Sequence, residues 1–154
     1  MKIAGDGIVL LGPYPGNLSF SLANYFNFYR KELPRFLPGT TLRALCPGEI
    51  EQFDLPHLVP SKRSEAWLAN YIRWPSQLIK QRAELFHIVD QGLTWYARFL
   101  SGGKKIATIH DLIAHMICVG KLRLPLPPLR RRPIIRECVR QVKRMNHLLS
   151  DSTF

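Results

Sequence analysis

Residues 104–115, KKIATIHDLIAH, are the stretch that decides how the rest of the chain is interpreted. Residues 106–109 are short, apolar and β-branched, which is typical of a strand buried on both faces of a parallel sheet. Two ionisable residues, His110 and Asp111, follow at the point where that strand should end. Because open α/β sheets bind ligands just beyond the carboxyl ends of their strands, this pair predicts a binding crevice at that edge.

Outward from this stretch, short apolar runs alternate with helical patterns. Further strands are predicted at residues 8–11 (IVLL), 40–47 (TTLRALCP), 84–89 (ELFHIV) and 147–154 (HLLSDSTF), the last including the start of its loop. Helices are predicted at residues 18–33, ending at Pro34, at 61–82 with a kink at Pro75, at 93–100, and from Pro133 to residue 145. The last of these has an apolar stripe that we expect to be buried: Ile134, Ile135, Cys138, Val139, Val142 and Met145.

This alternation predicts an α/β fold, a Rossmann-like and mainly parallel sheet with helices on both faces. The 154 residues have enough material for one substantial core, so we expect one domain spanning residues 1–154. The composition, 46% hydrophobic and 21% charged, is that of a globular protein. No run approaches the roughly 18 apolar residues that a membrane span requires.

The ends and the cysteines limit the class of protein further. The apolar patch at residues 7–11 is shorter than the core of a signal peptide, so the amino terminus is interpreted as the first strand. Cys46, Cys118 and Cys138 are odd in number, widely spaced and without metal-ligand spacing. We therefore expect no disulfide framework, no zinc site or other metal, no cofactor, and a cytoplasmic location.

The positive charge is concentrated in the second part of the chain. Residues 1–61 contain five basic and five acidic residues, whereas residues 62–154 contain seventeen and six and so carry the whole excess of +11. Such a surface attracts phosphorylated substrates, anionic lipids or nucleic acid, and the charge alone does not distinguish among them. A solvated basic face without a partner is an equally good interpretation.

Polar residues end a second strand and occupy the first loop. Asp90 and Gln91 follow the run at 84–89, and Gly16 and Asn17 follow the first strand. These polar residues also have simpler structural explanations. Asp90 and Asp111 could each cap a following helix, and the role of Gly16 could be limited to a helix-entry turn. The role of His110 could likewise be limited to a hydrogen bond with a neighbouring backbone group. His87 and His115 are interpreted as structural.

The order of these motifs resembles the amino-terminal domain of GT-B glycosyltransferases of family 4. The resemblance rests on PYPGN, LFHIVDQG, IATIHDL, a basic helix and HLLSDST, and it covers nearly the whole chain. It implies that His110 is catalytic, faces an interdomain cleft and bonds the transferred sugar. It places the backbone of Gly16 and Asn17 near the donor diphosphate and Asp90, Gln91 and Asp111 on the substrate side, and it matches Ser150 and Thr153 to the family's Ser and Thr.

Two departures from the family's pattern limit what the resemblance implies. The first loop has Pro15 and Gly16 where the family often has two glycines, and the carboxy-terminal domain that binds the nucleotide sugar is not in these residues. We therefore expect the acceptor-side domain of a retaining glycosyltransferase. By itself this domain should be inactive, and the acceptor should be a sugar or a lipid-linked or phosphorylated molecule.

Two alternatives belong to other classes. A metal-dependent phosphohydrolase would need further His and Asp ligands on helices, whereas this His-Asp pair ends a strand. A binding module without catalysis would use the basic half. Nucleic acid is disfavoured as its partner, because no helix-turn-helix, zinc or aromatic-sheet signature accompanies the charge. Arg130, Arg131 and Arg132 lie near Leu122, Leu124, Leu126 and Leu129, which predicts binding to the inner face of an anionic membrane unless the leucines pack into the core.

Overall fold

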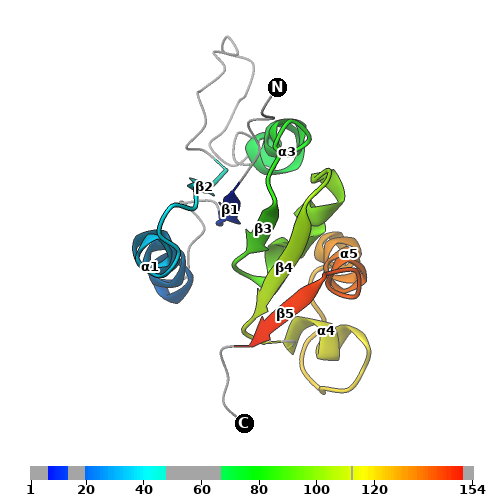
Figure 1. Cartoon of the computed structure of the whole chain (residues 1–154). Coiled ribbons are helices and arrows are strands. Elements are labelled where there is room, and N and C mark those ends of the chain that lie inside the picture. Colours follow the sequence, from blue (N-terminus) through cyan, green and yellow to red (C-terminus); the bar gives the residue numbers. More distant parts are fainter. Residues whose placement is uncertain (1–6, 14–19, 48–66, 112, 151–154) are drawn as a thin grey trace.

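The computed structural model describes residues 7–13, 20–47, 67–111 and 113–150 of the chain. The strands are β1 Ile8–Leu11, β2 Leu42–Leu45, β3 Leu85–Ile88, β4 Lys104–Ile109 and β5 His147–Ser150. The helices are α1 Phe20–Phe36, α3 Trp74–Leu78, α4 Ile113–Cys118 and α5 Arg132–Val142, with the π-helical turn η2 Ala69–Arg73 and the 3₁₀ helices η3 Gln91–Phe99 and η4 Leu129–Arg131. Figure 1 shows these elements arranged around one sheet.

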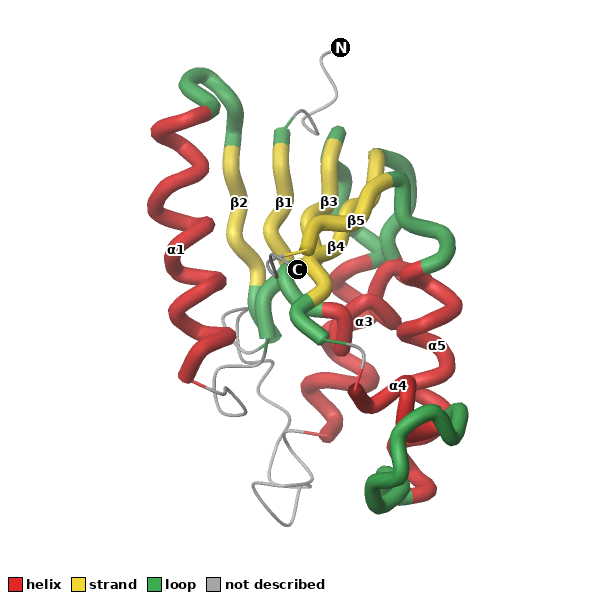
Figure 2. The backbone as a smooth tube through the Cα atoms, turned by 90° about the horizontal axis from the view of Figure 1, so that it is seen from below, coloured by secondary structure: helices red, strands yellow, loops and turns green. Residues whose placement is uncertain are grey.

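The strands form a five-stranded sheet in the order β2-β1-β3-β4-β5, and every neighbouring pair is parallel. The strand order changes direction at β1, because the chain passes from β1 to β2 on one side and then returns to β3 on the other. The predicted α/β class, a Rossmann-like parallel sheet with helices, is therefore confirmed. The carboxyl ends of all five strands lie at the same edge (Figure 2).

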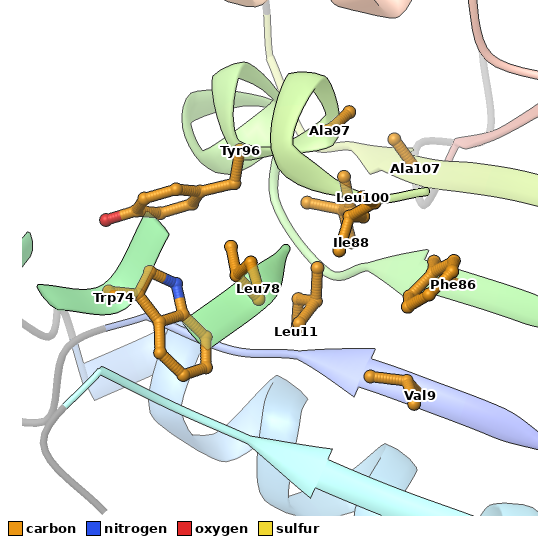
Figure 3. Close-up of a cluster of buried hydrophobic side chains, with 10 residues drawn as sticks. All are labelled: Val9, Leu11, Trp74, Leu78, Phe86, Ile88, Tyr96, Ala97, Leu100 and Ala107. Carbon is orange, nitrogen blue, oxygen red and sulfur yellow. The ribbon is translucent and has the colours of Figure 1, made fainter. Parts of the chain in front are cut away.

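Helices cover both faces of the sheet, and each face has its own core. Leu10 and Val89 pack with Phe26 of α1 on one face. Val9, Phe86 and the other inward residues of the opposite face pack against α3 and η3 (Figure 3). Right-handed crossovers that run in opposite directions from β1 place their helices on opposite faces, which explains this division.

Proline affects two helices in different ways. The prediction that Pro34 ends the first helix is wrong, because α1 continues to Phe36 and the Leu37 amide donates to the Leu33 carbonyl at 3.0 Å. Pro34 lies only two residues before the end of α1, so its missing amide and its ring disturb few further helical hydrogen bonds. Pro75 lies in the first turn of α3, directly after the π-helical turn η2, in agreement with the predicted irregularity there.

The last strand, β5, lies at the edge of the sheet as described. All four of its residues are exposed, including Leu148 and Leu149. Within the described residues, no helix is both long enough and apolar enough to span a membrane.

Candidate functional site

The candidate site lies at the carboxyl ends of β3 and β4. These strands are hydrogen-bonded neighbours, and β3 also pairs with β1, where the strand order changes direction. Doubly wound sheets bind ligands beyond the carboxyl ends of their strands, beside such a point. His110 and Asp111 follow β4 there, and Asp90 and Gln91 follow β3.

His110 is held in place by contacts with both loops. Its backbone amide donates to Oε1 of Gln91 at 2.9 Å, and its ring Nε2 lies 2.9 Å from the carbonyl oxygen of Val89. Because a carbonyl only accepts, Nε2 must carry a hydrogen, and in the neutral ring Nδ1 is then an acceptor. The ring also packs edge-on against Tyr25, with 4.7 Å between centroids. The backbone-bonding role considered for His110 is therefore present, and it also fixes the orientation of the imidazole.

Asp90 begins η3. Its Oδ1 accepts a hydrogen bond from the Gly92 amide at 2.6 Å, which satisfies one of the free amides at the start of a helix. Burial raises the pKa of the Asp90 carboxyl, and the Gly92 hydrogen bond and the nearby His110 oppose that rise. Gln91, the residue after Asp90, bonds the His110 amide, so the loops that follow β3 and β4 meet at this point.

Asp111 also acts as a cap. Its Oδ1 accepts a hydrogen bond from the Ile113 amide at 3.0 Å, immediately before α4. The capping interpretation of both aspartates is thus confirmed. Gly16, Asn17 and Thr153 lie outside the described residues, so the predicted approach of Gly16 to this crevice stays a prediction.

A group of buried and half-buried polar and aromatic residues beside the site was not predicted as a unit. His87 Nε2 lies 2.9 Å from Thr108 Oγ1, and the Tyr25 and Tyr29 hydroxyls are 2.8 Å apart. The Tyr29 ring packs edge-on against His87. The spacing of Tyr25 and Tyr29 by four residues places them on one helix face, which is a sequence signal, but the pairing of His87 with Thr108 depends on strand register.

His87 gives the fold a specific pH dependence. Burial lowers the pKa of His87 to about 4, from 6.5. As the pH falls, the His87 imidazole binds a proton in the unfolded chain before it does so in the folded chain. The contribution of His87 to the free energy of unfolding is therefore complete above about pH 6.5 and is lost as the pH falls toward 4. Through this group alone, the free energy of unfolding should be about 2 kcal/mol lower at pH 5 than at pH 7.

Urea unfolding of the wild type and His87→Gln at both pH values would test this expectation. Glutamine can still bond Thr108 but does not titrate. The free energy of unfolding of His87→Gln should therefore fall by about 2 kcal/mol less than that of the wild type between pH 7 and pH 5. An equal loss of stability in both proteins between pH 7 and pH 5 would show that His87 is not the titrating group.

A pocket of about 130 Å3 opens next to the candidate site, between α4 and α5. Gln91 and Asp111 form part of its wall, together with aliphatic residues of α5. The thiol of Cys138 donates to the Gly92 carbonyl at 3.3 Å and joins α5 to the start of η3.

The prediction that the whole apolar stripe of the last helix is buried is wrong. Only Cys138 is buried. The other residues of the stripe are half-buried: Ile134, Ile135, Val139, Val142 and Met145. The helix packs on η3 with one side only, so the other side of the stripe borders the pocket.

The connection between α4 and α5 presents leucines to solvent. Leu124 and Leu126 are each 54% exposed and Leu129 is 74% exposed, whereas Leu122 is half-buried. The alternative in which these leucines pack into the core is therefore wrong for three of the four. Arg131 is exposed beside them, and Arg132 Nε donates to the Pro127 carbonyl at 3.0 Å.

The basic face predicted for the last helix is exposed. It comprises Arg136, Arg140, Lys143 and Arg144. The Glu137 carboxylate partly offsets this charge through an ion pair with Arg140 at 2.5 Å. A hydrogen bond from Gln141 holds the pKa of Glu137 below its usual value.

In the parts of the chain that the structure describes, no group of three or more His, Cys, Asp or Glu side chains could hold a metal ion. No protein-family profile, curated protein or solved structure gave a significant match to the chain.

Proposed function

We propose that this chain is the acceptor-side domain of a retaining GT-B glycosyltransferase that moves a sugar from a nucleotide-sugar donor to an acceptor. The observation that supports the proposal is the meeting of His110 with Gln91 and Asp90 at the carboxyl edge of β3 and β4. This edge is where such sheets bind ligands, and the contacts hold the imidazole in one orientation.

The chemistry needs only a few oriented groups on this side. Sugar transfer from a nucleotide donor passes through an oxocarbenium-like centre while a diphosphate departs, and fixed polar groups stabilise both. In this proposal His110 contacts the transferred sugar, and Asp90, Gln91 and Asp111 lie on the acceptor side. Gly16 and Asn17 approach the diphosphate, and a separate nucleotide-sugar-binding domain holds the rest of the donor.

A transfer assay tests the proposal directly. The chain would be incubated with a panel of nucleotide sugars and acceptors, alone and together with a donor-binding domain of the same enzyme class, and products measured by mass spectrometry. We expect no transfer by the chain alone, because an open cleft leaves its electrostatic contacts weakened by water. Failure of every combination to release nucleotide would count against the assignment.

A second function, reversible attachment to an anionic membrane, is favoured by the exposed leucines. Leu124, Leu126 and Leu129 lie among exposed cationic side chains, so apolar insertion and electrostatic attraction are available on one strip. Each basic residue near such a surface contributes about 1 kcal/mol. In this proposal the protein is cytoplasmic and peripheral on the inner face of the membrane.

Cosedimentation with vesicles of increasing anionic-lipid content would measure this attachment. Binding should increase with lipid charge, decrease with salt, and drop at least tenfold when Arg130, Arg131 and Arg132 are replaced by serine. The matched control replaces Arg136, Arg140 and Arg144 by serine, which removes the same charge from the basic face of the last predicted helix, and should change binding much less. Binding that ignores lipid charge contradicts the proposal, and tighter salt-sensitive binding to DNA would favour a nucleic-acid partner instead.

A further inference from the structure

The pocket between α4 and α5 is lined mainly by aliphatic side chains and lies directly beside the candidate site. Its walls include Ala114 of α4, Ile134, Ile135 and Val139 of α5, and Gln91 and Asp111. Two of these residues, Gln91 and Asp111, also belong to the candidate site. The pocket therefore adjoins the candidate site through these two residues.

The pocket has the size and the surface for a short hydrocarbon segment. Its volume is about 130 Å3, and a cavity of roughly 150 Å3 is enough to hold a benzene-sized molecule. Ile134, Ile135 and Val139 are only half-buried, so a chain of about six carbons would remove part of their surface from water.

The pocket wall also has a polar part, which carries the Asp111 carboxylate. Asp111 is exposed and accepts from the Ile113 amide through Oδ1, while Gln91 bonds the amide of His110. The Asp111 carboxylate repels an anionic group placed beside it, but it accepts a hydrogen bond from a hydroxyl. The arrangement therefore suits a molecule with a hydroxyl at one end and a hydrocarbon chain at the other.

We propose that this pocket binds the alkyl or isoprenoid chain of the acceptor, with the acceptor hydroxyl at Asp111, beside the carboxyl end of β4. This inference rests on the proposed glycosyltransferase function and assigns the class of acceptor. Exposed Lys121, Arg123 and Arg131 lie on the connection between α4 and α5, the two helices that border the pocket.

Nuclear magnetic resonance of the chain, labelled at its Ile, Leu and Val methyl groups, would test this with simple alcohols as probes. Titration with 1-butanol, 1-pentanol and 1-hexanol should shift the methyl signals of Ile134, Ile135 and Val139. Affinity should rise about fourfold for each added methylene, because each one buries further apolar surface. The rise should level off beyond about six carbons, when the pocket is full.

A pair of identical substitutions supplies the control. Val139→Phe fills the pocket and should weaken 1-hexanol binding at least tenfold. Val119→Phe places the same ring at a site that is 52% exposed and outside the pocket, and should leave binding unchanged. If Val139→Phe fails to fold, Ala114→Leu fills the same space from α4.

Three results would overturn the proposal: affinity independent of chain length, shifts centred on Leu124 and Leu126, or wild-type binding by a folded pocket-filled variant. Alkanol binding needs no donor, so the two proposals fail separately. Alkanol binding together with no sugar transfer in any combination with a donor-binding domain overturns the glycosyltransferase assignment alone. Sugar transfer to acceptors that lack a hydrocarbon chain, together with no alkanol binding, overturns the pocket assignment alone.

Discussion

Replacing His110 by alanine in an enzyme that contains this domain is expected to lower turnover about a hundredfold. Removing one polar group that stabilises charge in a transition state typically costs a factor of this size. The same change should lower the free energy of unfolding by only about 1 kcal/mol, because the ring loses one hydrogen bond to the Val89 carbonyl and its packing on Tyr25. Turnover under saturating donor and thermal unfolding should be measured on the same preparation.

His110→Gln separates a role in catalysis from a role in holding the loop. A glutamine amide can still donate to the Val89 carbonyl, but it does not replace an imidazole that contacts the sugar. If His110 acts on the substrate, the glutamine variant should regain stability and remain slow. Recovery of wild-type turnover by glutamine, or normal turnover by alanine, would leave His110 with its backbone contact as its only role.

Alanine in place of Phe86 is expected to lower the free energy of unfolding by about 3–5 kcal/mol, the usual range for removing a buried aromatic ring. Phe86 is fully buried on β3, next to its register partner Val9, in the core that α3 and η3 cover (Figure 3). Both helices pack onto this layer, so little of the resulting cavity can close. Urea unfolding followed by far-ultraviolet circular dichroism would measure the loss.

Phe36 provides the matched control for that substitution. It lies at the end of α1 with 75% of its side chain exposed, so Phe36→Ala should change stability by no more than about 0.5 kcal/mol. A loss below about 2 kcal/mol for Phe86→Ala would mean that the core on this face packs more loosely than the structure describes. If Phe86→Ala is too unstable to purify, Phe86→Leu takes its place, and a smaller loss in the free energy of unfolding is expected for it.

The sequence by itself determined the alternation of strands and helices and the polar residues at two strand ends. A continuous apolar run, as at residues 106–109, and a repeat of three to four residues, as in α5, are local properties of the chain. The positions of Asp90, Gln91, His110 and Asp111 after β3 and β4 followed from the same local patterns. Parallel pairing then brings such ends to one edge, which is why part of the site was predictable.

Only the tertiary structure decided which strands are neighbours and which apolar surfaces are covered. The order of β1, β3 and β4 places His87 against Thr108, 21 residues apart, and no local pattern specifies that pair. The stripe on α5 has the same period whether both of its sides are buried or one borders a pocket. Burial is a property of contacts between distant segments, so the pocket beside Asp111 and the exposed leucines before α5 emerge only when the chain is folded.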